Sequence, residues 1–386
     1  MDRATRKVVF LTGTRADFGK LKPLMQVVDA SPDFECSIFA TGMHLLSRYG
    51  LTVEEISKAG FRRIYPYMNQ VHGESMELAL ANTVYGLSRY VQEYEPDLLV
   101  VHGDRAETLA GAIVGSLRNI LVAHIEGGEI SGTVDELVRH AVSKLSHLHF
   151  VASPVAEERL IQLGERPESI HVIGSPDIDM MLAADLPSLE EVKVRYDVSF
   201  DSYGIVLFHP VTTDAPALQK IHARELVAAL LESGQSFVVI YPNNDKGCEY
   251  IFEAYEALNG HSRFRLLPSL RFEYFLTLLK HSHCLIGNSS AGIYEAPVYA
   301  VPSINIGSRQ SNRFRHESIL DVACEKSAML VALSRAGALR ERLNPCYFFG
   351  DGSSARRFFE ILTTEEFWKT PKQKQFCDLP YAGARQ

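Results

Sequence analysis

The first half of the chain alternates between short apolar runs and longer stretches in which apolar residues recur with helical spacing. Short apolar runs are typical of strands buried on both faces of a sheet. The predicted strands are Val8–Thr12, Cys36–Thr41, Asp97–Val101, Leu121–Ile125, His149–Ala152 and Ile170–Ile173. The predicted helices are Leu21–Val28, Met76–Val91, Ala106–Leu117, Val134–Leu145 and Val155–Leu163. This alternation favours a parallel, doubly wound α/β sheet.

The alternation stops at Gly174-Ser175-Pro176 and restarts after a polar stretch, so we expect a hinge around residues 176–200. Strands are then predicted at Ile205–His209, Phe237–Tyr241, Arg265–Leu267, Cys284–Ile286 and Ser303–Ile306. Helices are predicted at Leu218–Leu231, Glu249–Leu258, Phe272–Leu279, Ile293–Tyr299, Ala355–Leu362 and Glu365–Trp368. We therefore expect two similar α/β domains, 1–175 and 176–365, with a cleft between them. A tail, 366–386, is expected to pack back on the first domain.

Composition and charge argue against several classes of protein. The chain has 386 residues and a net charge of −8, which does not fit the basic footprint of a nucleic-acid binder. An anionic substrate would need local positive charge. No apolar run approaches the roughly 18 residues of a membrane-spanning helix, and the first run, VVFLT, is too short for a signal peptide. The six cysteines have no paired spacing, so we expect a reduced, cytoplasmic protein.

Three carboxylates are predicted at the rim of the first sheet. Asp104 and Glu126 each follow a predicted strand, and in an open parallel sheet the ligand crevice lies outside the carboxyl ends of the strands. Asp104 could instead cap the helix that begins at Ala106. Glu126 precedes Gly127-Gly128 and has no helix to cap, and the paired glycines would let the backbone approach a ligand.

The third carboxylate is Asp135. Thr133 and Glu136 form a capping-box pattern, which puts Asp135 in a first helical turn, where acids are favoured by the dipole. Alternatively, Arg139 on the same helix face holds Asp135 at the cleft. Like charges crowded in one pocket separate their pKa values, so one acid can stay protonated at neutral pH. One acid and one base would suit an elimination reaction.

Cationic and polar residues follow other predicted strands. Arg15 and Lys20 lie in the turn GTRADFGK, where they could hold a phosphate or remain solvated. In the second half, His209 follows a strand and could titrate near neutrality or bind phosphate. Asn243 ends the next strand. The segment GNSSAGIYEAP predicts either an anion site at a helix N-terminus, built on Ser289 and Ser290, or a well-capped surface helix.

Two further groups complete the candidate site. Glu295 could accept hydrogen bonds from ribose hydroxyls, and Arg309 and Arg313 add positive charge for phosphate. The histidines at 102, 124, 140, 147 and 149 could suggest a metal site, but their spacing does not converge, so we favour a protein without a metal.

These segments together resemble the hydrolysing UDP-N-acetylglucosamine 2-epimerases of bacterial sialic acid synthesis. The motifs are TGTRADFGK, HGDR, HIEGGEISGTVDE, IGSPD, FHPVTT, YPNND, RFEYF and NSSAG, and they span nearly the whole chain. The resemblance implies two Rossmann-like domains, as in the two-domain glycosyltransferases. It also implies elimination of UDP to a 2-acetamidoglucal, then hydration to N-acetylmannosamine, without a cofactor or metal.

The resemblance also implies residue roles. The catalytic residues would be Asp104, Glu126, Asp135 and His209. The substrate contacts would be Arg15, Lys20, His44, Arg105, Arg139, Asn243, Ser289, Ser290, Glu295 and Arg309. The chain departs from its relatives at Tyr294, where they carry Arg. We expect a homo-oligomer, a dimer or a tetramer, that binds a nucleotide sugar and neither nucleic acid nor membrane.

Several other functions share these motifs. The first alternative is a hydrolysing epimerase for UDP-2,4-diacetamido-2,4,6-trideoxyglucose in legionaminic acid synthesis. A second is a non-hydrolysing 2-epimerase, which returns UDP-N-acetylmannosamine. A third is a glycosyltransferase, and a fourth is a nucleotide-sugar sensor without turnover. Converging acids argue against the sensor, because a protein that only binds gains nothing by repelling a diphosphate.

Overall fold

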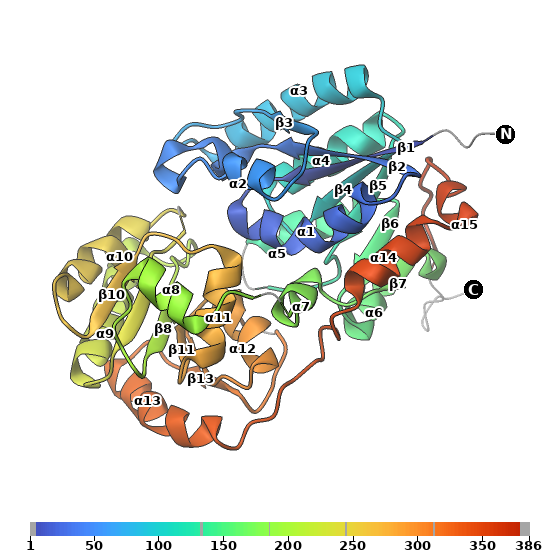
Figure 1. Cartoon of the computed structure of the whole chain (residues 1–386). Coiled ribbons are helices and arrows are strands. Elements are labelled where there is room, and N and C mark those ends of the chain that lie inside the picture. Colours follow the sequence, from blue (N-terminus) through green and yellow to red (C-terminus); the bar gives the residue numbers. More distant parts are fainter. Residues whose placement is uncertain (1–4, 132–133, 185, 244, 312, 379–386) are drawn as a thin grey trace, which may run out of the picture. The chain divides into compact units, whose positions relative to one another are not determined.

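The computed structural model describes residues 5–131, 134–184, 186–243, 245–311 and 313–378. These residues form two compact units, each built on its own parallel sheet (Figure 1). Unit 1 contains the described parts of Met1–Glu129, Val134–Met180 and Phe349–Gln386, and unit 2 those of Ile130–Thr133 and Met181–Phe348. The predicted fold class, two Rossmann-like doubly wound α/β domains, is confirmed. Among the described helices, none has the length and apolar character needed to cross a bilayer.

The sheet of unit 1 has the strand order β3-β2-β1-β4-β5-β6-β7. Its strands are β1 (Arg6–Thr12), β2 (Phe34–Ala40), β3 (Ile64–Pro66), β4 (Leu98–His102), β5 (Leu121–Ile125), β6 (Leu148–Val151) and β7 (Ile170–Val172). Successive side chains of a strand point to opposite faces, so Val8 and Phe10 pack on one face of the sheet and Val9 and Leu11 on the other. Both sets are buried because helices cover both faces.

The two helical layers of unit 1 come from different parts of the chain. One face packs against α1 (Arg15–Asp29) and α14 (Ser354–Leu362), and the other against α3 (Met76–Tyr94), α4 (Ala106–Leu117) and α5 (Val134–Leu145). The remaining elements are α2 (Val53–Lys58), α6 (Pro154–Gln162), α7 (Pro176–Met181), α15 (Glu365–Trp368) and the 3-10 turns η1 (Gly42–Leu45), η2 (Ser47–Tyr49) and η3 (Pro167–Ser169).

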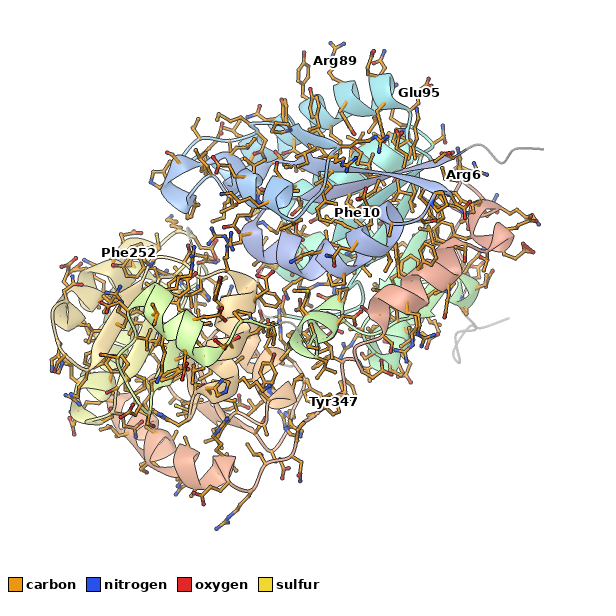
Figure 2. All side chains as sticks on the ribbon, in the orientation of Figure 1. Arg6, Phe10, Arg89, Glu95, Phe252 and Tyr347 are labelled. Atoms are coloured by element: carbon orange, nitrogen blue, oxygen red, sulfur yellow. The ribbon has the colours of Figure 1, made fainter. Side chains whose placement is uncertain are left out.

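Helix α14 corrects the predicted domain boundary at residue 365. Figure 1 shows α14 beside α1, although the two helices lie at opposite ends of the sequence. Phe358 and Leu362 of α14 are fully buried in the core of unit 1. The ring of Phe358 lies 6.5 Å from that of Phe10, which Figure 2 labels. The chain therefore returns to unit 1 at residue 349, before the predicted tail begins.

The sheet of unit 2 has the strand order β10-β9-β8-β11-β12-β13. Its strands are β8 (Gly204–Leu207), β9 (Phe237–Ile240), β10 (Phe264–Leu267), β11 (Leu285–Gly287), β12 (Ser303–Ile306) and β13 (Ile319–Val322). Its helices are α8 (Leu189–Tyr196), α9 (Pro216–Glu232), α10 (Cys248–Tyr255), α11 (Phe272–His281), α12 (Glu295–Val298) and α13 (Lys326–Arg340), with the 3-10 turns η4 (Glu256–Leu258) and η5 (Ser290–Gly292).

Several elements differ from the sequence predictions. Helices α7 and α8 lie within the predicted hinge, and α8 begins with a capping box between Ser188 and Glu191. The edge strands β3 and β13 and the helix α13 were not predicted. The helix predicted at Ile293–Tyr299 is only α12, Glu295–Val298, preceded by the 3-10 turn η5. That short helix weakens the predicted anion site at a helix N-terminus.

Candidate active site

The strand order reverses between β1 and β4 in unit 1 and between β8 and β11 in unit 2. In open α/β sheets ligands bind at this switch point, beyond the carboxyl ends of the strands. In unit 1 the switch point brings the loop after β1 beside the loop after β4. Strand β5 pairs with β4 so that Ile125 lies opposite His102, which places Glu126 at the same edge. Most of the predicted unit 1 site follows from this register.

Asp104 does not cap α4, because the N-cap position is occupied by Arg105. The carboxylate of Asp104 instead accepts a hydrogen bond from the guanidinium of Arg139 on α5. The side chain of Arg139 is 7% exposed and that of Asp104 is 25% exposed, so the ion pair is partly shielded from water. Of the two interpretations of Asp104, the structure supports the one in which its carboxylate belongs to the site.

Glu126 is held firmly at the end of β5. Its backbone φ is +61°, in the left-handed region that non-glycine residues seldom adopt and that costs about 1–3 kcal/mol. Its Oε2 lies 3.1 Å from Nε2 of His102, and its Oε1 accepts a hydrogen bond from the hydroxyl of Ser175. Both carboxylate oxygens therefore have partners, which fixes the side chain in spite of the strained backbone.

The pKa of Glu126 differs from the sequence expectation. Burial alone would raise it, but the hydrogen bond from His102 and the charge of Lys20 hold it well below its ordinary value. The expectation that crowded carboxylates keep one acid protonated is therefore wrong for Glu126. His102 and Lys20, and not a second carboxylate, are the main causes of this shift besides burial.

Lys20 and Arg15 both lie on α1 and both contact carboxylates. The ammonium of Lys20 pairs with Asp177, at the start of α7. The guanidinium of Arg15 pairs with Glu55 of α2, with 2.6 Å between Nη2 and Oε1. The predicted phosphate-binding cations are thus present near the switch point, and each is already oriented by an acid.

One predicted catalytic residue, Asp135, and two predicted substrate contacts, Arg105 and His44, have mixed outcomes. Asp135 lies in the first turn of α5, while Thr133, its predicted N-cap, lies outside the described residues. Arg105 donates through Nε to Glu107 at 3.3 Å. His44 is fully buried and its ring contacts the hydroxyls of Thr12 and Thr52, and burial lowers its pKa to about 4. His44 is therefore a core histidine, and its prediction as a substrate contact is wrong.

The paired glycines after Glu126 serve the packing of the loop. A side chain at Gly127 would meet Nδ1 of His124 at 2.8 Å, and one at Gly128, whose φ is +75°, would meet the carbonyl oxygen of Ala156 at 2.3 Å. The close approach that requires glycine here is to the protein itself, not to a ligand as predicted.

The histidines of unit 1 have partners within the fold. His124 contacts Ser143 and the carbonyl of Gly103, His147 accepts from the backbone of Val122, and His149 pairs with Glu165. In the described ranges of the chain, we find no group of three or more histidine, cysteine or acidic residues arranged to hold a metal ion.

The switch point of unit 2 is organised by Asn288, which follows β11. Its side chain accepts from the backbone N–H of His209 at 2.7 Å and donates to the carbonyl of His209 at 2.8 Å. Gly287 is required here, because its φ is +149° and a Cβ would lie 1.8 Å from the carbonyl oxygen of Leu207. The loops after β8 and β11 are thereby joined, and His209 is fixed between them.

His209 is not poised to titrate near neutrality. Its Nδ1 accepts a hydrogen bond from the backbone N–H of Asn243 at 3.1 Å. Burial, together with the nearby charge of Arg309, lowers the pKa of His209 to about 3. The imidazole is therefore neutral at pH 7, and its Nδ1 is the acceptor nitrogen. The predicted titration of His209 near neutrality is wrong.

The other predicted unit 2 contacts lie around the same loops. Arg309 donates to the carbonyl of Asn288 at 3.2 Å, and the side chain of Asn243 donates to Asp245 at 2.5 Å. Ser289 caps η5, and Ser290 begins it. Glu295 begins α12 and is buried. The structure thus gathers the predicted histidine, arginine, asparagine and serines at one edge of the unit 2 sheet.

The predicted catalytic and substrate-binding residues do not include Asp17, His102 and Ser175, which contact Glu126 directly or through one another. Nδ1 of His102 lies 2.7 Å from Oδ1 of Asp17. Asp17 and Ser175 were within motifs already singled out, TRADFGK and IGSPD, but nothing in either motif indicates which strand end it will face. His102, the last residue of β4, was the one recognisable signal, since it immediately precedes Gly103-Asp104.

Known proteins match almost the whole chain. Residues 26–363 match the family model described as UDP-N-acetylglucosamine 2-epimerase. The UDP-N-acetylglucosamine 2-epimerase of Neisseria meningitidis serogroup B is 48% identical over 377 residues, which are 97% of this chain and 99% of that protein. The UDP-N,N'-diacetylbacillosamine 2-epimerase (hydrolyzing) of Legionella pneumophila is 35% identical over 364 residues, 93% of this chain and 96% of that protein.

A solved structure supports the fold. The UDP-GlcNAc 2-epimerase of Methanocaldococcus jannaschii in complex with UDP-GlcNAc and UDP superimposes with a TM-score of 0.79. The superposition covers 92% of this chain and 99% of that one at 20% identity. With the family model and the two relatives, the matches lead to one conclusion: the chain belongs to the UDP-N-acetylglucosamine 2-epimerase family.

Proposed function

We propose that this protein is a hydrolysing UDP-N-acetylglucosamine 2-epimerase, which converts UDP-N-acetylglucosamine and water to N-acetylmannosamine and UDP for sialic acid synthesis. The observation that carries the proposal is the edge of the unit 1 sheet, where Glu126 is held ionised and Asp104 is paired with Arg139. Membership in the UDP-N-acetylglucosamine 2-epimerase family is the reason that we propose a nucleotide sugar as the substrate. An ionised carboxylate and a second acid at one strand edge are the groups that proton transfer at a sugar carbon requires.

The proposed reaction has two stages. In the first, a carboxylate takes the proton from carbon 2, the electrons of that C–H bond form the double bond to carbon 1, and the bond from carbon 1 to the diphosphate oxygen breaks. The products of this stage are 2-acetamidoglucal and UDP. In the second stage, water adds its hydroxyl to carbon 1 and a protonated acid gives a proton to carbon 2 on the same face, a syn addition. The remaining proton of the water molecule restores that acid, and the carboxyl group protonated in the first stage releases its proton to solvent, so both acids end as they began.

The roles of the remaining residues follow from charge. A departing diphosphate needs cations, and Arg15, Lys20 and Arg309 are candidates for that role. We assign the uridine nucleotide to the loops joined by Asn288, where Asn243, Ser289 and Ser290 offer polar groups and Glu295 could accept from the ribose. His209, neutral and fixed by Asn243, can donate a hydrogen bond through Nε2 without carrying charge.

The second candidate function is a hydrolysing epimerase of a diacetamido sugar. It is favoured by the Legionella relative, whose name includes that substrate and which matches 93% of this chain. The higher identity of the Neisseria relative, 48% against 35%, is the reason that we prefer UDP-N-acetylglucosamine. A non-hydrolysing epimerase would use the same acids but would return UDP-N-acetylmannosamine as its product.

One incubation distinguishes these functions. The protein is mixed with UDP-N-acetylglucosamine alone in heavy water, and the products are followed by proton NMR. We expect free N-acetylmannosamine that carries deuterium at carbon 2. Nucleotide-linked mannosamine would instead identify a non-hydrolysing epimerase. An unchanged spectrum, with turnover of the UDP-linked diacetamido sugar in a parallel sample, would identify the second candidate function.

A further inference from the structure

The side chain of His102 lies between two carboxylates that come from distant parts of the sequence. Its Nδ1 is 2.7 Å from Oδ1 of Asp17 on α1, and its Nε2 is 3.1 Å from Oε2 of Glu126 after β5. The His102 side chain is 9% exposed, so little water reaches it. Thr108 fixes the backbone at the same point by donating to the carbonyl of His102 at 2.8 Å.

This geometry determines the charge of the ring. An ionised carboxylate only accepts hydrogen bonds, and a ring nitrogen without a proton cannot donate one. With a carboxylate on each side, the imidazole satisfies both partners only when both nitrogens carry protons. Burial alone would lower the pKa of His102, but the hydrogen bonds to Asp17 and Glu126 more than offset this and raise it to about 10. His102 is therefore an imidazolium at neutral pH.

Asp17 is itself fixed by hydrogen bonds, so it holds the imidazolium of His102 in place and limits the movement of Glu126. Oδ2 of Asp17 accepts from the backbone N–H of Gly13 at 3.1 Å, and its own backbone N–H donates to the hydroxyl of Thr14 at 3.1 Å. Burial would raise the pKa of Asp17, but the hydrogen bond with His102 and the charge of its ring lower it. The result is a fixed chain of charges, negative, positive and negative, from the start of α1 to the end of β5.

The other charged groups near this chain leave His102 the central cation. Lys20 of α1 adds positive charge near Glu126 and is paired with Asp177, and Ser175 binds the other oxygen of Glu126. His124 of β5 is not a second cation, because burial lowers its pKa to about 3. His44, behind Asp17, is neutral for the same reason.

We propose that His102 is a positioning residue that acts through Glu126, holding that carboxylate ionised and aimed by bridging it to Asp17. The proposal rests on the proposed function and adds to it different proton-transfer roles for the acids. A carboxylate paired with a cation is ionised at neutral pH, so it begins the reaction able to accept a proton and without one to give. Glu126 is therefore the proton acceptor of the elimination, and the proton donor of the hydration must be another acid of the site.

The first test is a titration of the wild-type protein without substrate. With ¹⁵N-labelled histidine, we expect both ring nitrogens of His102 to keep their protons from pH 5 to about pH 9, as the raised pKa requires. His102→Gln identifies the resonance by its loss. A His102 ring that is singly protonated at pH 7 would overturn the proposal. This measurement needs no turnover, so it decides the charge of the bridge even if the proposed substrate is wrong.

The second test is the pH dependence of kcat/KM, which reports groups of the free enzyme. In His102→Gln the amide can still donate one hydrogen bond but carries no charge. We expect turnover at pH 7 to fall about 100-fold, as for a misplaced catalytic group. We also expect the acidic limb of the profile to move up by about one pH unit or more, because Glu126 loses its cation and keeps its burial.

The matched control is His171→Gln, which changes a half-buried histidine of β7, two strands from β5, whose ring lies 5.3 Å from that of Phe150. We expect its profile to keep the wild-type limbs. A His102→Gln profile that is lowered uniformly, with both limbs unmoved, would mean that His102 is only structural, and the proposal would fail. Wild-type protein that forms no product from UDP-N-acetylglucosamine would instead reject the proposed function, and the titration would still stand.

Discussion

Asp104 and Glu126 follow neighbouring strands, yet their surroundings differ. Glu126 is bound to the imidazolium of His102 and to the hydroxyl of Ser175, and its side chain is 16% exposed. Asp104 is bound to the guanidinium of Arg139, which stays charged at every working pH, and its side chain is 25% exposed. At the scale of single residues, the side chain of Asp104 is therefore the more exposed of the two acids and the more accessible to water.

We predict that Asp104→Asn lowers kcat by about a thousandfold, within the range that general acid–base groups contribute. The amide keeps the shape of the side chain and can still accept a hydrogen bond from Arg139, but it cannot carry a proton to or from the sugar. Initial rates of UDP release give kcat, and isothermal titration with UDP gives the affinity of the nucleotide, which we expect to change little.

The matched control for this variant is Asp97→Asn. Asp97 lies just before β4, at the end of the strand opposite to Asp104, and pairs with Arg6 at 3.1 Å. Asp97→Asn removes an equivalent charge beside the opposite end of β4 from Asp104. Near-wild-type turnover in Asp104→Asn, with Asp97→Asn also active, would contradict the role of Asp104.

Single residues also show where sequence reasoning ends. Asp104 and Glu126 were predictable because each follows a buried apolar run, and the edge of a parallel sheet gathers such positions. Their partners were not, because the contacts cross long separations, 85 residues for Asp17 and His102 and 35 for Asp104 and Arg139. The direction of a pKa shift depends on these partners, so the charge of Glu126 and the neutrality of His209 were out of reach.

Among the elements, the segment after α15 packs on the rest of unit 1 through contacts that include a buried ion pair. Lys374 contacts Glu165, whose side chain is 1% exposed, and donates to the carbonyls of Ser143 and Ser146 at 3.0 and 2.6 Å, at the C-terminal end of α5. Burial would raise the pKa of Glu165, but its bond with His149 and the ammonium groups of Lys144 and Lys374 lower it to about 2.

We predict that Lys374→Met destabilises unit 1 by about 3 kcal/mol, because a buried carboxylate loses a cation. A group with a lowered pKa stabilises the fold above its unfolded value, near 4.5, and loses that contribution as pH falls through the folded value. In the variant the loss should therefore begin at higher pH. Trp368, the single tryptophan, stacks on Phe34 in unit 1, so its fluorescence during urea unfolding at pH 4 and 7 reports this unit.

Lys58→Met is the control, since Lys58 makes an exposed pair with Glu54 on α2, also in unit 1. Exposed pairs of this kind contribute well under about 1 kcal/mol. Equal unfolding midpoints for Lys374→Met and Lys58→Met at both pH values would show that the ion pair of Glu165 contributes nothing to unit 1.

Long elements were the most predictable, and short or edge elements the least. The apolar pattern is strong in helices α3, α4 and α5, where it repeats over several turns. It is also strong in the central strands, which are apolar on both faces. Strand β3 has three residues, mostly exposed, so it offers no buried run to detect. Helix α13 did carry a signal, with Met329, Ala332, Leu333 and Ala336 buried at helical spacing, but the short apolar side chains made it faint.

At the scale of the whole molecule, unit 1 is discontinuous while unit 2 is nearly continuous. The chain leaves unit 1 near residue 180 and returns at 349 to supply α14 and α15. Ser175, which binds Glu126, also contacts the chain where it re-enters unit 1. Its backbone N–H donates to the carbonyl of Phe349 at 2.6 Å. The C-terminal segment therefore completes the unit that carries the acids.

This arrangement makes the effect of a truncation predictable. A chain ending at Phe348 lacks Phe358, Leu362 and Phe367, which are all buried in the core of unit 1. Large core side chains contribute about 2–5 kcal/mol each, so their joint loss is comparable with the roughly 5–15 kcal/mol that stabilises a typical domain. We expect calorimetry of this chain to show a heat-absorption peak from unit 2 and none from unit 1. A chain ending at Asp378, which retains the described contacts of α14 and α15, should show both. Two peaks from the shorter chain would contradict this prediction. They would show that unit 1 folds without α14, and that the packing of Phe358 against Phe10 and Phe150 contributes little to the stability of unit 1.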